Sequence, residues 1–509
     1  MFEKLTELIS TGDHKEALYE FQEEFLHIDE RTPSEAAKLC VLTATLWEQL
    51  EDSVAEFDTI AKGLSYDPAN YELYYMLGLY YLELNADQAY LCFKMALMYC
   101  TDEQDRQVIQ ESLKSLLASR NVRVRRTSVM ILSFNDLEIM KDCIKSVEES
   151  FPKDELEVVV VDNASTEDGV LEYLREKERS ADYTFKLIEN SENLGFSRGC
   201  NIGAAACDPD NDIFFLNNDA VLMPGSFFYL KMGLYDSRNV GAVSALSNSA
   251  SLQEVPQSFF GQENGEDGLM WHKRLGYRKS LEIFRECAKE KVVPMRRPYV
   301  ASFRLTGFAL LVSKAALEAV MTDGKVFDEF FSPAYFEDDD LGMRIARAGF
   351  LQYVCKNSLI YHNGGGSFLG DNSLMEKGRE KFKEKWGFDV WGYSLPWFEA
   401  ADKVIQLARE KKGQLRILDF TCGFGVTGAY IKEQVPTAFV AGVCRTGFEA
   451  GIAGNLVDDV AFGEMNTIRL PWESHSFDVV LAETTTVSRG RISECLKEGG
   501  IGITQEDFE

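Results

Sequence analysis

Leu156-Glu-Val-Val-Val-Val-Asp-Asn-Ala-Ser-Thr166 is the stretch that decides the fold. Its apolar run predicts a strand buried on both faces, and its polar end predicts a turn. Further apolar runs lie at 128–133, 185–189 and 212–216, separated by segments with the 3.6-residue period of helices. Strands that alternate with helices predict parallel β/α units, so we expect an α/β fold.

Polar side chains follow each of these strands. They comprise Ser133–Asn135, Asp162, residues 189–201 and Asn217–Asp219. Asn, Asp and Gly are common in any turn, so each cluster alone is weak evidence. Parallel sheets bind ligands at the carboxyl ends of their strands, however. Four clusters at four successive strand ends therefore indicate a ligand site.

Five motifs between about residues 126 and 390 carry a specific resemblance. They are Val160–Thr166, Asn193–Gly203, Phe215–Asp219, Phe327–Leu341 and Tyr361–Ser367. In this order they resemble the family-2 glycosyltransferases, the rhamnosyltransferase-like branch in particular. The resemblance implies a GT-A (Rossmann-like) domain that transfers a sugar with inversion from a nucleotide-diphosphate donor. The family's acceptors are cell-surface glycans, lipid-linked glycans or proteins.

The resemblance also implies roles for single residues. Asp338 matches the general base, and Asp219 and His362 match the ligands of Mn²⁺ or Mg²⁺. Asp162 matches the acceptor of a hydrogen bond from the nucleotide base, and Arg198 is a candidate partner of the diphosphate. The residues that we expect to bind the nucleotide sugar are Ser133, Asn135, Asp162, Asn193, Arg198, Asn218 and Gly307.

These residue types suit the chemistry without the family. A diphosphate leaving group needs a counter-charge, which a divalent ion on hard ligands supplies. The usual acidic pair is reduced here to Asn218-Asp219, so one carboxylate fewer faces the diphosphate. Two simpler interpretations remain open. Glu337–Asp340 would cap the helix expected at 341–348, and His362 would be an ordinary core histidine.

Residues 1–120 show helical periodicity, with breaks at Pro33 and Asp67-Pro68. The segment 71–96 resembles the tetratricopeptide pattern, because Gly78 and Ala89 allow two antiparallel helices to approach and Phe93 fills the space beside them. The alternative is a plain helical bundle. A repeat domain would present a concave surface to a protein partner or a protein acceptor.

Residues 398–509 begin a second Rossmann-like unit. Asp419–Gly425 resembles the glycine-rich turn of class I, S-adenosylmethionine-dependent methyltransferases, and 476–482 and 496–500 resemble their fourth strand and the turn before the fifth. Thr421 replaces the first glycine, Cys444 replaces the ribose-binding acid, and the last two strands are not seen after a fifth strand at 501–504. We therefore expect a degenerate, truncated domain with an exposed sheet edge that does not bind S-adenosylmethionine.

Composition sets the outer limits. The 509 residues suggest three domains, which we place at 1–120, 125–397 and 398–509. The net charge of −29 argues against nucleic acid as a partner. Eleven scattered cysteines, no signal pattern and no long apolar segment predict a cytoplasmic protein without a transmembrane span, with peripheral attachment to a membrane left open. A non-catalytic scaffold and a bifunctional glycosyl- and methyltransferase are the competing functions.

Overall fold

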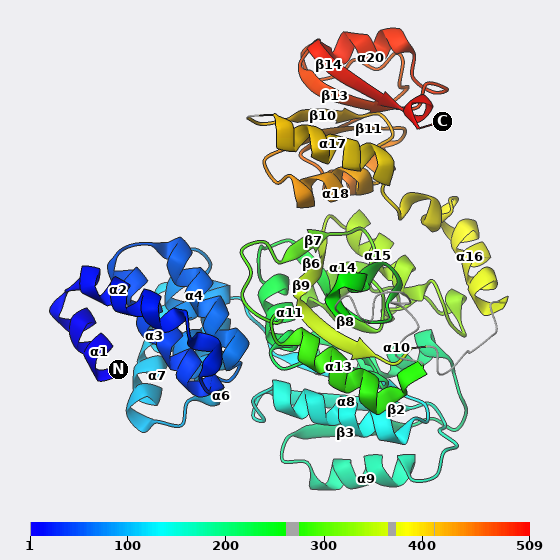
Figure 1. The fold of residues 1–509 in the computed structure, drawn as a ribbon. Coiled ribbons are helices and arrows are strands. Elements are labelled where there is room, and N and C mark those ends of the chain that lie inside the picture. The colour runs from blue at the N-terminus through cyan, green and yellow to red at the C-terminus, as the bar shows by residue number, and fades with distance from the viewer. Residues whose placement is uncertain (1, 261–273, 365–372, 412, 509) are drawn as a thin grey trace.

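The computed structural model describes residues 2–260, 274–364, 373–411 and 413–508. Figure 1 shows an all-helical N-terminal part, a central part on a large sheet and a C-terminal part on a smaller sheet. The α/β class predicted from the apolar runs is confirmed.

The N-terminal part consists of helices packed as antiparallel neighbours. Asn70 and Asn85 cap α5 and α6 through their side-chain oxygens, which fixes where both helices begin. Gly78 faces Phe93: a Cβ added there would lie 2.5 Å from a ring carbon. The expected close approach of these two helices is thus present. The helices are α1 (Phe2–Thr11), α2 (His14–Phe25), α3 (Pro33–Gln49), α4 (Ser53–Tyr66), α5 (Tyr71–Tyr81), α6 (Ala86–Tyr99) and α7 (Glu103–Ser119), with a short turn η1 (Ile28–Glu30).

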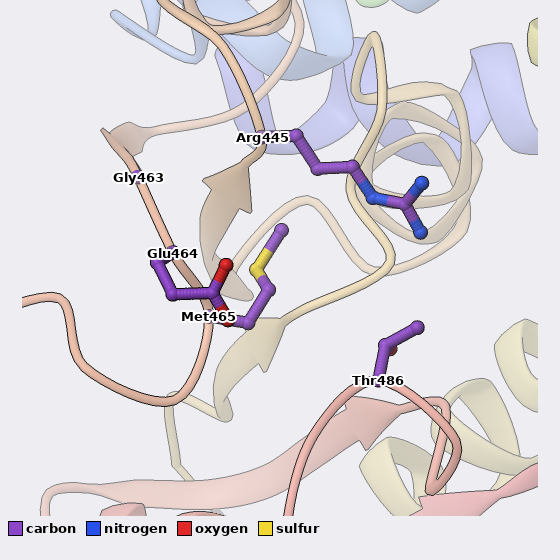
Figure 2. A pocket seen from close by; sticks show the side chains of 5 residues that line it. All are labelled: Arg445, Gly463, Glu464, Met465 and Thr486. Carbon is purple, nitrogen blue, oxygen red and sulfur yellow. The ribbon is translucent and has the colours of Figure 1, made fainter.

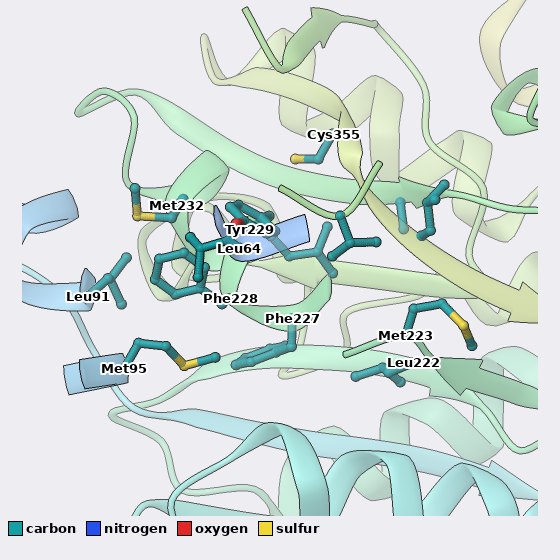
Figure 3. Close-up of a cluster of buried hydrophobic side chains, with 14 of the residues drawn as sticks. Leu64, Leu91, Met95, Leu222, Met223, Phe227, Phe228, Tyr229, Met232 and Cys355 are labelled. Carbon is teal, nitrogen blue, oxygen red and sulfur yellow. The ribbon is translucent and has the colours of Figure 1, made fainter. Parts of the chain in front are cut away.

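Helix α6 of the N-terminal part packs against α11 (Ser226–Leu234) of the central part. In Figure 3, Leu91 and Met95 of α6 lie beside the phenylalanines of α11 in one buried cluster. Gln88 donates a hydrogen bond from Nε2 to the carbonyl of Met232 at 3.0 Å, although both residues are buried. The two parts therefore share a hydrophobic core and a buried polar contact.

The central sheet has the order β3-β2-β1-β4-β8-β6-β9-β5, with β7 paired to β9. The first four strands in this order are parallel, as expected. Strand β8 runs antiparallel to both of its neighbours, so the expectation of parallel units alone is wrong there. The strands are β1 (Thr127–Ser133), β2 (Leu156–Asp162), β3 (Thr184–Glu189), β4 (Asp212–Asn217), β5 (Ala220–Leu222), β6 (Val240–Leu246), β7 (Tyr299–Ala301), β8 (Ala309–Val312) and β9 (Leu351–His362).

The direction of β8 matters for the site. Because β8 is antiparallel to β4, with Ala309 opposite Leu216, its amino end lies beside the carboxyl end of β4. Residues just before β8 thus reach the edge where ligands of a parallel sheet bind.

Helices and short turns complete the central part. The four acids 337–340 were expected to precede a helix at 341–348, but they form the first turn of α15. The helices are α8 (Leu137–Ser150), α9 (Val170–Ser180), α10 (Phe196–Ala206), α11, α13 (Tyr277–Ala288), α14 (Lys314–Val320), α15 (Glu337–Arg347) and α16 (Ser373–Trp386). The short turns are η2 (Ser251–Gln253), η3 (Gln257–Phe260), η5 (Glu329–Phe331) and η6 (Val390–Tyr393).

The C-terminal sheet is parallel throughout, in the order β12-β11-β10-β13-β14, which leaves β12 and β14 at its edges. Residues 496–500 were expected to be a turn, but they belong to β14, where the register against β13 is irregular. The elements are α17 (Phe398–Glu410), β10 (Arg416–Asp419), α18 (Val426–Gln434), β11 (Phe439–Cys444), α19 (Gly447–Ala453), β12 (Asp459–Phe462), β13 (Phe477–Ala482), α20 (Arg489–Cys495), β14 (Leu496–Thr504) and η7 (Gln505–Asp507).

All eleven cysteines are free thiols, and all but Cys287 are buried. They fit the expectation of reduced core residues. Among the helices of the described segments, none combines the length and the apolar character that crossing a membrane requires.

Candidate active site

Asp219 and His362 come together at the carboxyl edge of the central sheet. Asp219 immediately precedes β5, and His362 ends β9, which pairs antiparallel with β5 so that Ala220 lies opposite His362. The Nε2 atom of His362 lies 3.3 Å from Oδ1 of Asp219, and both side chains are about nine-tenths buried, at 13% and 12% exposure. The amide of Gly364 donates to Oδ2 of Asp219 at 3.0 Å.

The hydrogen bonds of His362 suit a metal ligand. Its Nδ1 lies 2.6 Å from the carbonyl oxygen of Ser249, which can only accept, so Nδ1 carries a proton. Nε2 is then the nitrogen left to face Asp219, and a backbone carbonyl on the other ring nitrogen is the usual support of a ligating histidine. Burial disfavours the imidazolium, but the facing Asp219 carboxylate outweighs this and raises the pKa of His362.

A hard carboxylate and an imidazole on one edge fit Mn²⁺ or Mg²⁺. Within the described segments, no group of three or more His, Cys, Asp or Glu side chains could hold a metal ion. If an ion binds at this pair, Asp219 and His362 would supply two ligands, and the remaining positions would go to water and to a ligand's own oxygens. The expected motif at 361–367 extends past residue 364, and its residues 365–367 lie outside the described segments.

Asp338 lies in the first turn of α15 and is only partly buried. Its Oδ2 accepts a hydrogen bond from the amide of Gly307 at 2.8 Å, and its Oδ1 accepts one from the amide of Asp339 at 2.9 Å. A Cβ at position 307 would lie 3.2 Å from the Cβ of Asp338, so glycine is the residue that allows this approach. Gly307 was expected to bind the nucleotide sugar; in the structure its amide holds the carboxylate of Asp338.

Phe308 connects this carboxylate to the metal-ligand pair. Its carbonyl accepts from the amide of Asn217, and its ring stacks on that of His362 with the centroids 5.0 Å apart. Gly307 and Phe308 therefore contact Asp338 on one side and His362 on the other. Two consecutive residues thus connect the candidate base to the candidate metal ligands, although 119 residues separate Asp219 from Asp338.

The other acids of α15 are engaged in the interior. Asp340 is fully buried and binds Arg344 at 2.9 Å, and Asp339 pairs with Arg304 at 2.5 Å. Burial raises the pKa of Asp339 to about 7, although Arg304 opposes the shift. Burial and the neighbouring Asp338 raise the pKa of Glu337 well above its usual range. Glu337, Asp339 and Asp340 are thus buried, and Asp338 is the least buried of the four acids.

The residues expected to contact the nucleotide lie at the ends of β1 and β2, which are neighbours in register. Asp162 is buried, and its carboxylate accepts from the amide and the hydroxyl of Ser165 at 3.0 and 2.5 Å. The hydroxyl of Ser133 lies 3.4 Å from the same carboxylate. Asn135 has a φ of 60° and accepts from the amides of Thr166 and Glu167, so it shapes the turn. These polar groups form one hydrogen-bonded network at the carboxyl ends of β1 and β2, which we call the polar rim.

The other three residues expected at the nucleotide differ in their contacts. They are Asn193, Arg198 and Asn218. The side chain of Asn218 donates to the carbonyl of Asn135 at 3.2 Å, which connects the rim to Asp219. Asn193 accepts from Asn163 and from the amide of Gly195, so its oxygen is used within the protein. Arg198, on α10, is 53% exposed and lies 3.7 Å from Glu329. Arg198 and Asn193 are exposed, whereas Asn218 is half-buried.

Several residues around Asp219, His362 and Asp338 were not predicted from the sequence. Ser249 fixes the tautomer of His362, Phe308 packs on its ring, and Arg304 pairs with Asp339. Asp136, with a φ of 60°, has a pKa raised by burial and by the charge of Asp219. A polar residue directly after the β1 turn was a signal for Asp136; the others carry none.

The C-terminal sheet has its own strand-end edge. Asp419 accepts from the amide and hydroxyl of Thr421, both at 2.7 Å, and Cys444 is buried with its Sγ 3.5 Å from the carbonyl of Gly423. Burial raises the pKa of Asp419 to about 6. An open cavity of about 420 Å³ lies past the carboxyl ends of β11, β12 and β13. It is shown in Figure 2 and is lined by Arg445, Gly463, Glu464, Met465 and Thr486.

Comparisons with known proteins bear on the central part. Residues 128–284 match the model of glycosyl transferase family 2. This match covers β1 to β6 and Asp219, and it ends before Gly307, Asp338 and His362. None of the curated proteins matches the chain.

Solved structures also match. One is GalNAc-T7 with UDP, GalNAc and Mn²⁺, at 14% identity and a TM-score of 0.37, covering 51% of this chain and 48% of its own. A second is the mannosyltransferase PcManGT from Pyrobaculum calidifontis with GDP-Man and Mn²⁺, at 14% identity and a TM-score of 0.34, covering 68% and 98%. A third is residues 1–349 of S. aureus TarS, at 17% identity and a TM-score of 0.31, covering 51% and 65%.

The chain spans about half the length of the first of these structures. At these scores the neighbours add no detail of the site. The family match and the mixed sheet together support a GT-A-like sheet domain, whose residues 128–284 are similar to glycosyl transferase family 2.

Proposed function

We propose that this protein is an inverting, metal-assisted glycosyltransferase. In this proposal it transfers a sugar from a nucleoside-diphosphate donor to a hydroxyl group of a glycan or a protein. The observation that carries the proposal is the continuous path from Asp338 through Gly307 and Phe308 to His362 and Asp219, beside a family-2 domain.

Asp338 would act as the general base. Its carboxylate is held by two backbone amides at 2.8 and 2.9 Å, so it is oriented before any acceptor arrives. It would take the proton of the acceptor hydroxyl as the new C–O bond forms at the anomeric carbon and the bond to the diphosphate oxygen breaks. One displacement of this kind inverts the anomeric centre, and it needs no covalent enzyme intermediate.

Asp219 and His362 would hold a divalent ion, which would neutralise the charge that develops on the leaving diphosphate. The polar rim from Ser133 to Asp162 would receive the nucleoside, and Asn218 and Arg198 would lie on the way to the diphosphate. Arg198 is suited to this because a guanidinium binds oxyanions through two parallel hydrogen bonds. Asn193 would act indirectly, through the turn it stabilises.

The flanking parts enter the proposal as follows. The helical N-terminal part would be a tetratricopeptide-like domain that binds a protein acceptor or a partner. The C-terminal part would be a degenerate methyltransferase-like domain, because Cys444 is buried beneath the turn instead of offering a carboxylate to a ribose. The same proposal places the enzyme in the cytoplasm, with the donor as its small-molecule partner.

Titration calorimetry with UDP, GDP and dTDP, each with and without Mn²⁺, tests the donor site. We expect at least one nucleotide to bind more tightly with Mn²⁺, and we expect Asp219→Ala to remove the metal-dependent gain. Asp13→Ala is the matched control, since Asp13 makes no side-chain capping bond in the helical part. Equal binding with and without Mn²⁺ by the wild-type protein would contradict the metal assignment.

A further inference from the structure

The glycine-rich turn of the C-terminal part, Thr421–Gly425, packs against residues that precede this part in the chain. A Cβ added to Gly423 would lie 3.1 Å from the ring of Tyr393, so this ring already covers the turn. The Tyr393 ring stacks on Phe424 with the centroids 4.4 Å apart, and its hydroxyl donates to Glu449 at 3.1 Å. The turn is therefore covered by η6, the segment that connects it to the central part.

The same turn packs against the transferase domain. Phe424 is 2% exposed, and its ring centroid lies 5.0 Å from that of Phe303. Both belong to one buried cluster with Met343 and Ala346 of α15 and Ile452 of α19. Figure 1 shows α15 on the side of the central part that faces the C-terminal part. The C-terminal part therefore packs against α15, the helix whose first turn carries Asp338.

Arg304 adds a polar connection at the same place. Its Nε lies 2.5 Å from Oδ1 of Asp339, the residue after the candidate base, and its Nη1 donates to the hydroxyl of Ser394 at 2.7 Å. The side chains of Arg304 and Asp339 are only 15% and 6% exposed, and Ser394 is buried. Loss of the guanidinium would leave a buried carboxylate without its counter-charge, which proteins tolerate poorly.

Asp340 is bonded to the end of α16, the helix that precedes η6. It accepts a hydrogen bond from the indole Nε1 of Trp386 at 3.0 Å and lies 2.5 Å from the ammonium group of Lys385. Trp386 in turn stacks on Phe448 of α19 with the centroids 6.0 Å apart. Two consecutive acids after Asp338 are therefore held by residues that also contact the C-terminal part or the segment leading to it.

We propose that the C-terminal Rossmann-like part acts as a brace for the catalytic helix α15, with Arg304 as the positioning residue that links Asp339 to Ser394. The brace keeps the first turn of α15 in place, so that Asp338 stays within hydrogen-bond distance of the amide of Gly307. Its effect on catalysis rests on the proposed function, but the mechanical link does not.

Hydrogen–deuterium exchange of the full-length protein tests the brace without any substrate. In Arg304→Gln, we expect the amides of 337–347 to exchange at least about tenfold faster than in the wild type, with a smaller increase in Ser394→Ala. Arg304→Lys should restore part of the protection, because it keeps the charge. Arg347→Gln, an exposed arginine in the last turn of the same helix, is the matched control.

A folded Arg304→Gln protein with wild-type exchange over 337–347 would overturn the brace. If Arg304→Gln does not fold, Ser394→Ala gives the answer, since it removes one hydroxyl and leaves the ion pair intact. With a donor that the wild type cleaves, Arg304→Gln should lower kcat about tenfold or more and leave the KM of the donor within about twofold. If the wild type cleaves no nucleotide sugar, the proposed function fails, and the exchange experiment still decides on the brace.

Discussion

Asp338→Asn tests the assignment of the general base, and the contacts of Asp338 set the loss of folding stability that the substitution should cause. The carboxylate accepts one backbone amide on each oxygen, at 2.8 Å from Gly307 and 2.9 Å from Asp339. An asparagine keeps one acceptor, and its NH₂ group must face the other amide, donor against donor. A hydrogen bond to a charged group contributes about 1.5–3 kcal/mol, so we expect the domain to lose stability on this scale.

The catalytic loss should be larger than the structural one. Removal of the proton acceptor lowers turnover by roughly 10²–10⁴, which corresponds to about 3–5 kcal/mol of transition-state stabilisation. Donor binding should stay nearly constant, since Asp338 faces the acceptor in our proposal. The two effects separate in experiment: thermal unfolding measures the first, and release of nucleoside diphosphate at a temperature well below unfolding measures the second.

Asp323→Asn is a suitable control. Asp323 is exposed and has a φ of 51°, a conformation that asparagine also tolerates. It should unfold and turn over like the wild type. Folded Asp338→Asn with turnover within about threefold of wild type would refute the role of Asp338 as the base.

Three further predictions follow from single contacts. Chelation of divalent ions, or Asp219→Ala in excess Mn²⁺, should abolish donor hydrolysis, because the leaving diphosphate then lacks its counter-charge; full activity in chelator would show that Arg198 or another cation suffices. Calorimetry should detect no S-adenosylmethionine binding at sub-millimolar concentration, since Tyr393 covers Gly423 and Cys444 is buried; a micromolar isotherm abolished by Asp419→Ala would revive the bifunctional alternative. Gly78→Ala should destabilise the α5–α6 pair by about 1–3 kcal/mol in thermal unfolding, because its Cβ would lie 2.5 Å from the Phe93 ring. Gly490→Ala on α20 is the control, since the space around Gly490 is open. Equal melting temperatures of the two variants would contradict this packing.

Much of the fold could be predicted from local patterns. The strands at 127–133, 156–162, 184–189 and 212–217 were found because buried parallel strands are continuous apolar runs. The direction of β8 could not be read, because a run of four buried residues looks the same in either orientation. The segment 496–500 was expected to be a turn because Gly499-Gly500 is a strong turn signal; it lies within β14, but residues 497–500 have no partner on β13, and the register shifts across them.

In the candidate site, too, some residues could be predicted from local motifs, whereas the contacts between distant residues could not. Asp219, His362 and Asp338 were assigned through motifs; in the structure Asp219 lies beside His362, and Gly307-Phe308 contacts both Asp338 and His362. The contacts that hold them in place were not accessible: Arg304 lies 35 residues before Asp339, and Ser249 lies 113 residues before His362. Nothing periodic connects such pairs, since only the packing of β8, α15 and β9 brings them into contact. The contact between the Gly307 amide and Asp338 could not be foreseen for the same reason.

The most direct test of the central claim is release of nucleoside diphosphate from a panel of nucleotide sugars, measured with purified full-length protein in Mn²⁺, in Mg²⁺ and in chelator. The proposal predicts that at least one donor is cleaved with a metal ion present, that chelator stops the reaction, and that Asp338→Asn lowers transfer to an acceptor. Absence of cleavage for every donor under all three conditions, or cleavage that continues unchanged in chelator and in Asp219→Ala, would contradict it.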